Sequence, residues 1–114
     1  GNLIGILDCN GLGFDGTIDA ITGLGDIADK YRTFGWNVTE ADGHDIGALV
    51  DVFDNLPPVS FDKPTLIACH TVKGHGVDYM ENQIKWHAGR LSPENRDEAI
   101  RQLEKAYEQK WGVQ

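Results

Sequence analysis

Two short apolar runs constrain the fold of this chain more than any other feature. LIGILD spans residues 3–8 and ends at a cluster of Asn, Gly and Asp, while TLIACHTV spans residues 65–72 and is followed by glycines. Continuous apolar runs of this length, bounded by turn residues, are typical of strands buried on both faces. A third segment, WNVTEA at residues 36–41, alternates large and polar residues as a strand does. The sequence therefore predicts three strands.

A single helix is predicted between the first and second strands and another between the second and third. The first covers 26–34, with Gly35 as its stop signal, and places Ile27, Tyr31 and Phe34 at helical spacing. The second begins near Asp45 and must end before Pro57. The apolar face predicted for this second helix consists of Ile46, Leu49, Val50 and Phe53.

Strands that alternate with single helices imply right-handed crossovers. We therefore expect an α/β fold, a parallel sheet with helices on both faces, and a single domain over residues 1–114.

The last third of the chain is expected to hold an ordered loop and one long helix. The loop covers 77–91, and the helix opens with Ser92 as its cap and Pro93 in its first turn. It is predicted to end near Trp111-Gly112. The buried stripe expected along it consists of Ala99, Ile100, Leu103 and Tyr107.

Composition excludes several classes of partner. Eighteen acidic against ten basic residues give a net charge of −8, which disfavours binding to nucleic acid or to anionic membrane surfaces. No apolar run approaches the roughly 20 residues that span a bilayer, and no signal-peptide pattern opens the chain, so a cytoplasmic location is expected. Cys9 and Cys69 are isolated within or beside apolar runs and are predicted to be reduced thiols.

Two polar, glycine-rich segments follow predicted strands. DCNGLGFDG begins at Asp8 and HTVKGHG begins at His70. In open parallel sheets, ligands bind at the carboxyl ends of the strands. Glycines allow close approach of the backbone to an anion, and the amide oxygen of Asn10 is suited to a hard cation such as Mg²⁺.

These segments carry a resemblance to the transketolases. NLIGILDCNGLGFDG resembles the second half of their thiamine diphosphate motif, in which a strand ends in Asp-Asx-Asn and Asp-Gly follows. RTFGWNVTEADGHDI and DKPTLIACHTVKGHGVDYMENQIKWHAG are similar to two further segments of that family, in the same order. The nearest pattern is the amino-terminal subunit of split transketolases. The resemblance implies that the chain is the carboxyl half of a thiamine diphosphate-binding domain.

The resemblance also assigns roles to individual residues. It implies that Asn10 gives its side-chain oxygen, and Leu12 its main-chain carbonyl, to a Mg²⁺ ion bridging the cofactor's phosphates. Gly11 belongs to the same cofactor-binding turn, and Leu12 and Phe14 would press against the cofactor's rings. His87 matches the family histidine that contacts both the diphosphate and the donor sugar, so it is the predicted catalytic residue.

The second glycine-rich segment is assigned in the same way. Lys73, Gly74 and Gly76 would shape the turn beside the cofactor. His44 and His70 are interpreted mainly as structural residues, and His75 as a turn residue that faces solvent.

Parts of the family pattern are absent from this sequence. There is no Gly-Asp-Gly, whose Asp supplies the carboxylate ligand to the metal, and no pyrimidine-binding domain with its activating glutamate. The chain opens with Gly-Asn rather than Met, which favours a fragment or processed subunit. The resemblance therefore implies partner chains that carry these parts, within a hetero- or homo-oligomer acting on sugar phosphates.

Three functions stay open from the sequence. The leading one is thiamine diphosphate- and Mg²⁺-dependent transfer of a two-carbon ketol unit between sugar phosphates. The second is a thiamine-dependent subunit that decarboxylates 2-oxoacids or forms acyloins. The third is a non-catalytic module that completes a partner's fold, because a piece with three strands exposes sheet edges and apolar faces.

Overall fold

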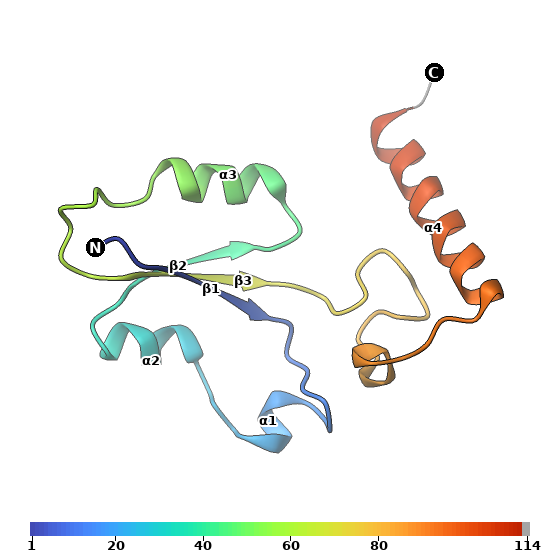
Figure 1. The fold of residues 1–114 in the computed structure, drawn as a ribbon, viewed down its shortest axis with the longest axis horizontal. Helices are drawn as coiled ribbons and strands as arrows, with labels where there is room; N and C mark the ends of the chain where they lie inside the picture. Colours follow the sequence, from blue (N-terminus) through green and yellow to red (C-terminus); the bar gives the residue numbers. More distant parts are fainter. Residues whose placement is uncertain (113–114) are drawn as a thin grey trace. The chain divides into compact units, whose positions relative to one another are not determined.

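The computed structural model describes residues 1–112. Their helices and strands follow one another along the chain as shown in Figure 1. The elements are β1 (Ile4–Cys9), α1 (Ile18–Ile21), α2 (Ile27–Thr33), β2 (Asn37–Asp42), α3 (Ile46–Asp54), β3 (Thr65–His70), the 3₁₀ helix η1 (Ile84–His87) and α4 (Pro93–Trp111).

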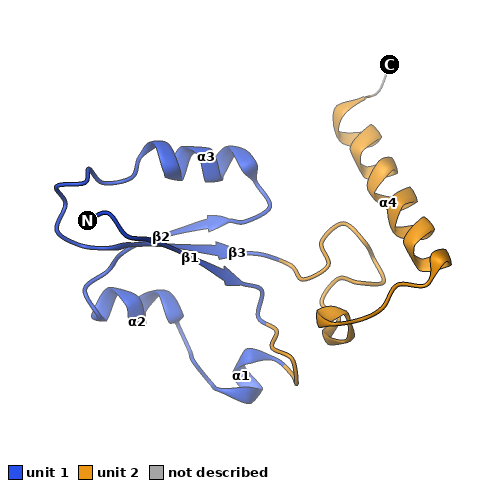
Figure 2. Ribbon diagram, viewed as in Figure 1, with its two compact units in different colours: residues 1–11, 17–71 blue, residues 12–16, 72–114 orange. Residues whose placement is uncertain are grey.

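These elements form two compact units, coloured separately in Figure 2. The first unit holds residues 1–11 and 17–71, which include the whole sheet. The second holds 12–16 and the described residues from 72 onward, which include η1 and α4. The prediction of one domain over the whole chain stays a prediction, and each unit is described by itself below.

The first unit is a parallel sheet of three strands in the order β1-β3-β2. The chain crosses from β1 over β3 to β2 through α2, and then returns to β3 through α3. Two crossovers of the same hand that run in opposite directions place their helices on opposite faces of the sheet. Figure 1 shows α2 and α3 on the two sides of the strands. The predicted α/β fold with helices on both faces is confirmed.

Local signals explain why these helices begin where they do. Asp26 and Asp45 cap α2 and α3, because each side chain accepts a hydrogen bond from a main-chain N–H in the first turn. Ser92 caps α4 in the same way, and Pro93 occupies its first turn. The four-residue helix α1, capped by Thr17, is too short for apolar periodicity to predict.

The core of the first unit is centred on β3. Thr65 to Cys69 are all buried, and Ile67 has an exposed fraction of 0%. Ala28 of α2 is also buried, whereas β1 alternates between half-buried and exposed residues. The expectation that the first strand is buried on both faces is therefore wrong for the described residues. β1 is an edge strand, and α2 and α3 pack mainly against β2.

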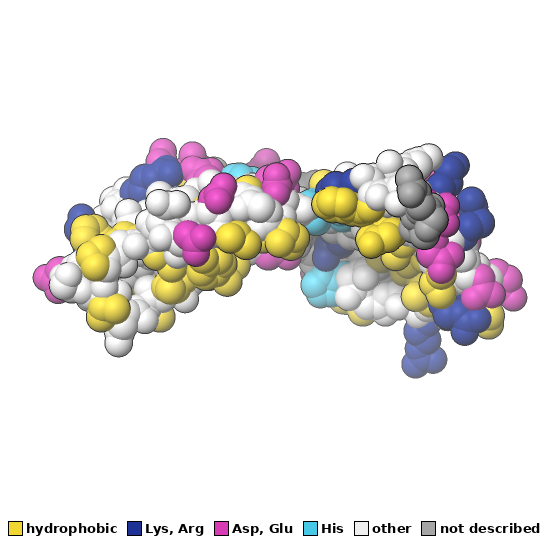
Figure 3. All heavy atoms as spheres, turned by 90° about the horizontal axis from the view of Figure 1, so that it is seen from above, with side chains coloured by type: hydrophobic (Ala, Val, Ile, Leu, Met, Phe, Trp, Pro, Cys, Tyr) yellow, Lys and Arg dark blue, Asp and Glu magenta, His cyan; other side chains and the backbone are white. Residues whose placement is uncertain are grey.

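The apolar faces predicted for α3 and α4 are likewise more exposed than expected. Figure 3 shows hydrophobic side chains at the surface over both units. On α4 only Ala99 is buried, and Leu103 keeps an exposed fraction of 48%. No sheet of its own unit lies behind α4, which explains why the predicted buried stripe is wrong. The exposed apolar residues on these two helices include Ile46, Val50 and Phe53 of α3 and Ile100, Leu103, Tyr107 and Trp111 of α4.

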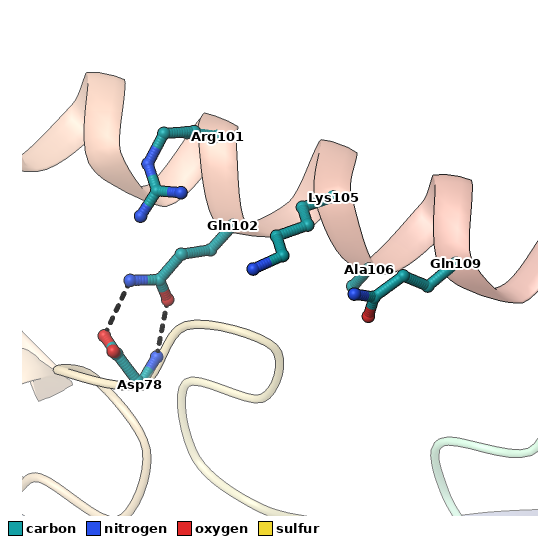
Figure 4. Close-up of a pocket in the computed structure, with 6 residues that line it drawn as sticks. All are labelled: Asp78, Arg101, Gln102, Lys105, Ala106 and Gln109. Atoms are coloured by element: carbon teal, nitrogen blue, oxygen red, sulfur yellow. Dashed lines mark hydrogen bonds between the residues drawn. The ribbon is translucent and has the colours of Figure 1, made fainter.

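α4 is held to the turn at Val77–Tyr79 by polar contacts, which Figure 4 shows in close-up. The side chain of Gln102 accepts from the main-chain N–H of Asp78 at 2.9 Å and donates to the Asp78 carboxylate at 2.8 Å. Gln102 also donates to Glu98 at 2.7 Å. Arg101 donates to both oxygens of Glu98, at 2.8 and 2.5 Å. One side of α4 is therefore fixed by this network, although its apolar stripe is not covered.

The network predicts a pH dependence of stability. The hydrogen bonds from Arg101, and secondarily from Gln102, lower the pKa of Glu98 from 4.5 to about 2. A carboxyl group whose pKa is lower in the folded state stabilises that state above pH 4.5, and this contribution is lost as the pH falls towards 2. Urea unfolding at pH 7, 4.5, 3 and 2 should show a steeper loss for the unmodified protein than for Glu98→Gln. Parallel profiles for the two proteins would contradict the prediction.

Candidate functional site

The segment after β1 folds into a tight turn. Gly11 has a φ of +71°, a conformation that glycine adopts at little cost and other residues rarely adopt. The N–H of Ile18 donates to the carbonyl of Gly11 at 2.9 Å, and the N–H of Gly13 donates to the carbonyl of Gly16 at 2.8 Å. In this turn the backbone conformation favours glycine at position 11.

Asn10 is held by a contact within the first unit. Its side-chain Nδ2 donates to Oδ2 of Asp8 at 3.1 Å. The other carboxylate oxygen of Asp8 accepts a hydrogen bond from the hydroxyl of Thr71, which follows β3. The predicted metal ligand Asn10 is thus connected to the ends of two neighbouring strands.

Phe14 and His87 lie against each other in the second unit. Their ring centroids are 5.3 Å apart and their planes meet at 88°, an edge-to-face contact. His87 is the last residue of η1, and Phe14 has an exposed fraction of 63%. The structure therefore brings together two predicted cofactor-binding residues that are far apart in the sequence.

The loop that carries His87 is ordered by its tryptophan. The indole N–H of Trp86 donates to the carbonyl of Tyr79 at 3.0 Å, and the two rings lie edge to face. The Tyr79 hydroxyl in turn donates to the carbonyl of Asn95 at 2.6 Å. The prediction of an ordered loop is correct, and the structure adds the 3₁₀ helix that presents His87.

The turn at 73–76 is closed on itself in the second unit. The carbonyl of Lys73 accepts from the N–H of Asn82 at 2.9 Å, and the N–H of Gly76 donates to the carboxylate of Glu81 at 3.0 Å. Gly74 and Gly76 have φ values of +75° and +87°. A Cβ on Gly74 would lie 2.6 Å from the carbonyl oxygen of Met80, so the close approach itself requires glycine.

A second polar cluster lies at the carboxyl edge of the sheet, and the sequence did not reveal it. His70 Nε2 lies 3.0 Å from Oε2 of Glu40, whose other oxygen accepts from Arg32 at 2.8 Å. The hydrogen bond from Arg32, and then that from His70, lowers the pKa of Glu40. The mainly structural interpretation of His70 is consistent with this contact to Glu40. Only the strand register, which pairs Asp42 with His70, could have placed Glu40 near His70.

A cavity of about 200 Å³ adjoins this cluster. It is lined by Cys9, Gly25, Asp26, Ile27, Ala28, Glu40, Ala68 and His70. Burial, and secondarily the Asp8 carboxylate, raises the pKa of the Cys9 thiol. Cys9 and Cys69 are both free thiols, as predicted.

The described residues 1–112 contain no group of three or more His, Cys, Asp or Glu side chains that could hold a metal ion. Among the same residues no helix is long and apolar enough to cross a membrane.

The predicted site residues are divided between the two units. Asn10 and Gly11 belong to the first unit, and the others belong to the second. The residues of the second unit are Leu12, Phe14, Lys73, Gly74 and His87. Within that unit, Phe14 meets His87, and Lys73 and Gly74 form one turn. The roles proposed for these residues stay predictions.

A parallel α/β sheet whose strands lead into glycine-rich turns defines a class of proteins that bind ligands at that edge. A family model described as "Transketolase, thiamine diphosphate binding domain" matches residues 1–113. The chain belongs to the transketolase family, as the resemblance indicated.

Relatives from two bacteria support this assignment. The chain is 36% identical over 107 residues to one subunit of the apulose-4-phosphate transketolase of Phocaeicola vulgatus, a match that covers 94% of this chain and 38% of that protein. It is 33% identical over 104 residues to the 6-deoxy-6-sulfo-D-fructose transketolase subunit SqwG of a Clostridium species, covering 91% of this chain and 38% of that protein. The chain thus spans little more than a third of these relatives.

Solved structures share the fold. A crystal structure of a transketolase mutant from Pichia stipitis superimposes with a TM-score of 0.63 at 21% identity. The match covers 96% of this chain and 21% of that chain.

Proposed function

We propose that this chain is part of a transketolase-type transferase that moves a two-carbon ketol unit between sugar phosphates, using thiamine diphosphate and Mg²⁺. The observation that carries the proposal is the contact between Phe14 and His87. Phe14 comes from the Asn-Gly segment and His87 from the Trp-His segment, and the family resemblance assigns each of them to the cofactor independently of this contact. Membership of the transketolase family supports this assignment.

The oxygens that the chain offers fit a magnesium ion in part. Mg²⁺ prefers oxygen ligands in an octahedral arrangement and commonly binds through one or two carboxylates plus phosphate oxygens. Asn10 would supply its amide oxygen and Leu12 its main-chain carbonyl. The family resemblance assigns the carboxylate ligand to a Gly-Asp-Gly segment, which the sequence of residues 1–114 does not contain.

The remaining residues would hold and orient the organic part of the site. Leu12 and Phe14 would press against the cofactor's rings, while the Gly74 turn, with Lys73 and Gly76, would allow the backbone to approach it. His87 would donate a hydrogen bond to the diphosphate and hold the donor sugar near the reacting carbon. Thiamine diphosphate, when bound, supplies the carbanion chemistry that breaks and forms the carbon–carbon bond. The residues of this chain position the reactants and stabilise charge, and none of them serves as the activating base.

The proposed activity requires partner chains. The exposed fraction of Ile6 on the edge strand β1 is 65%, and a strand edge with exposed apolar residues favours pairing with further structure. We propose that the partner supplies the first half of the diphosphate domain and the pyrimidine-binding domain with its glutamate. A hetero- or homo-oligomer in the cytoplasm stays a prediction.

Product analysis tests this function. The chain is assembled with the chains that carry the missing parts and is given xylulose 5-phosphate or pyruvate as donor, with an aldose phosphate as acceptor. Transfer of two carbons from xylulose 5-phosphate supports the proposal. Carbon dioxide release or acyloin formation from pyruvate alone would instead support the 2-oxoacid alternative. If the assembly forms but turns over neither donor, the chain is a module that completes a partner's fold.

A further inference from the structure

We propose that Asp8 is a positioning residue that sets which end of the Asn10 amide faces the cation. This inference rests on the proposed function, because it concerns the metal ligand assigned there. Its basis is the pair of hydrogen bonds that Asp8 accepts, one from Nδ2 of Asn10 at 3.1 Å and one from the hydroxyl of Thr71.

The chemistry of the two groups decides the orientation of the amide. An ionised carboxylate can only accept hydrogen bonds, so the end of Asn10 that meets Asp8 must be the NH₂ group. The amide oxygen is then the end directed away from Asp8. A hard cation binds the oxygen and not the NH₂ group, so the reversed amide would place two N–H donors where the cation needs a lone pair.

Asp8 is itself fixed from the neighbouring strand. Asp8 pairs with Cys69 across the β1–β3 ladder, and Thr71 follows directly after the last residue of β3. From there the Thr71 hydroxyl reaches the second carboxylate oxygen of Asp8. With both oxygens engaged, the carboxylate cannot rotate without losing one hydrogen bond.

Gly43, the residue directly after β2, packs closely against Thr71 beside Asp8. The N–H of Gly43, directly after β2, donates to the carbonyl of His70 at 2.8 Å. A Cβ on Gly43 would collide with Cγ2 of Thr71 and would lie 3.1 Å from Cβ of Cys69. The main chain at Gly43 therefore helps to keep Thr71 beside Asp8.

The first part of the test measures the amide directly. In the ¹⁵N-labelled chain, the side-chain NH₂ of Asn10 should be rigid and slow to exchange with solvent. Asp8→Ala should make it mobile and fast to exchange, and Thr71→Val should do so to a smaller degree. Asp42→Ala is the matched control, because Asp42 is a carboxylate at the end of β2 that instead accepts from the N–H of His44 at 2.8 Å. An Asn10 amide that is equally ordered in Asp8→Ala and in the unmodified protein would overturn the proposal.

The second part measures affinity for thiamine diphosphate with Mg²⁺ in the assembled protein. Asp8→Ala should weaken binding by about 10-fold or more, as loss of an outer-shell partner of a metal ligand usually does. Asp42→Ala should leave the affinity unchanged. If Asn10→Ala weakens binding and Asp8→Ala does not, the positioning role is wrong while the proposed cofactor site stands. If Asn10→Ala does not change the affinity, the proposed cofactor site is wrong. The NMR measurement on the Asn10 side chain then decides by itself whether Asp8 orients the amide.

Discussion

Ile67→Ala is expected to lower the free energy of unfolding of the sheet unit by about 2 to 5 kcal/mol. Ile67 lies in the central strand β3 and has an exposed fraction of 0%. Truncation removes buried methyl and methylene groups and leaves a cavity, because the surrounding structure relaxes only partially. Urea unfolding followed by circular dichroism measures the change.

Ile6→Ala is the matched control for this substitution. Ile6 is the direct partner of Ile67 in the β1–β3 ladder and points to the same face, but it is 65% exposed. Its truncation should cost less than about 1 kcal/mol in the isolated chain, because little of its surface leaves water on folding. Equal losses for the two variants would contradict the description of β3 as the core strand and β1 as an uncovered edge.

Gly74→Ala is expected to destabilise the second unit by about 2 to 4 kcal/mol. Two effects add at this position. The φ of +75° strains any residue with a Cβ, and that Cβ would lie 2.6 Å from the carbonyl oxygen of Met80 and 2.7 Å from its carbonyl carbon. Because backbone atoms cannot move aside as a side chain can, the turn must open. Hydrogen exchange of the Asn82 amide, which donates to Lys73 at 2.9 Å, reports that opening.

Gly76→Ala and Gly35→Ala separate the two effects. Gly76 has a φ of +87°, but its added Cβ would meet only Cδ2 of Leu103, the end of a flexible side chain, at 2.8 Å. Gly35 has a φ of +88° and nothing within 4 Å of an added Cβ. Both variants should cost only the strain of a positive φ, about 1 to 2 kcal/mol. If Gly74→Ala costs no more than Gly35→Ala, the close approach at Met80 does not constrain the turn.

The elements of the first unit could be predicted from the sequence because their signals are local. Capping residues such as Asp26 and Asp45 are recognised within a few positions, and the structure places helices directly after them. The strand at 65–70 was predicted two residues too long, because Thr71 and Val72 continue the apolar pattern although the ladder ends at His70. Alternation of strands and helices then left few topologies to consider.

Burial could not be predicted in the same way, because it depends on neighbours that are distant in the sequence. LIGILD has the composition of a buried strand, and yet β1 is an edge strand with exposed apolar residues. The stripe on α4 has helical periodicity, but periodicity does not identify what covers a face. Both errors concern apolar surface that the described residues, 1–112, leave exposed.

The candidate site also combines residues that the sequence could identify with contacts that only the tertiary structure reveals. Phe14 and His87 were found through the resemblance of whole segments, whereas Asn10 was also indicated by the suitability of its amide oxygen for a hard cation. The contact between Phe14 and His87, and the hold of Asp8 and Thr71 on Asn10, depend on tertiary structure. The cluster of Arg32, Glu40 and His70 was missed because its members come from three different elements and form no sequence motif.

Calorimetric titration of thiamine diphosphate with Mg²⁺ tests the central claim most directly. It is carried out on the chain alone and on the chain assembled with its partners, each with and without Asn10→Ala. Asn55→Ala serves as the control, since that amide caps the end of α3 by donating to the carbonyl of Asp51 at 2.8 Å. The account predicts that the assembly binds the cofactor and that Asn10→Ala weakens this binding at least about 10-fold, because that variant loses a direct metal ligand. Asn55→Ala should leave the binding unchanged. Binding that is indifferent to Asn10→Ala, or no binding by an intact assembly, would contradict the claim that the turn after β1 is part of the cofactor site.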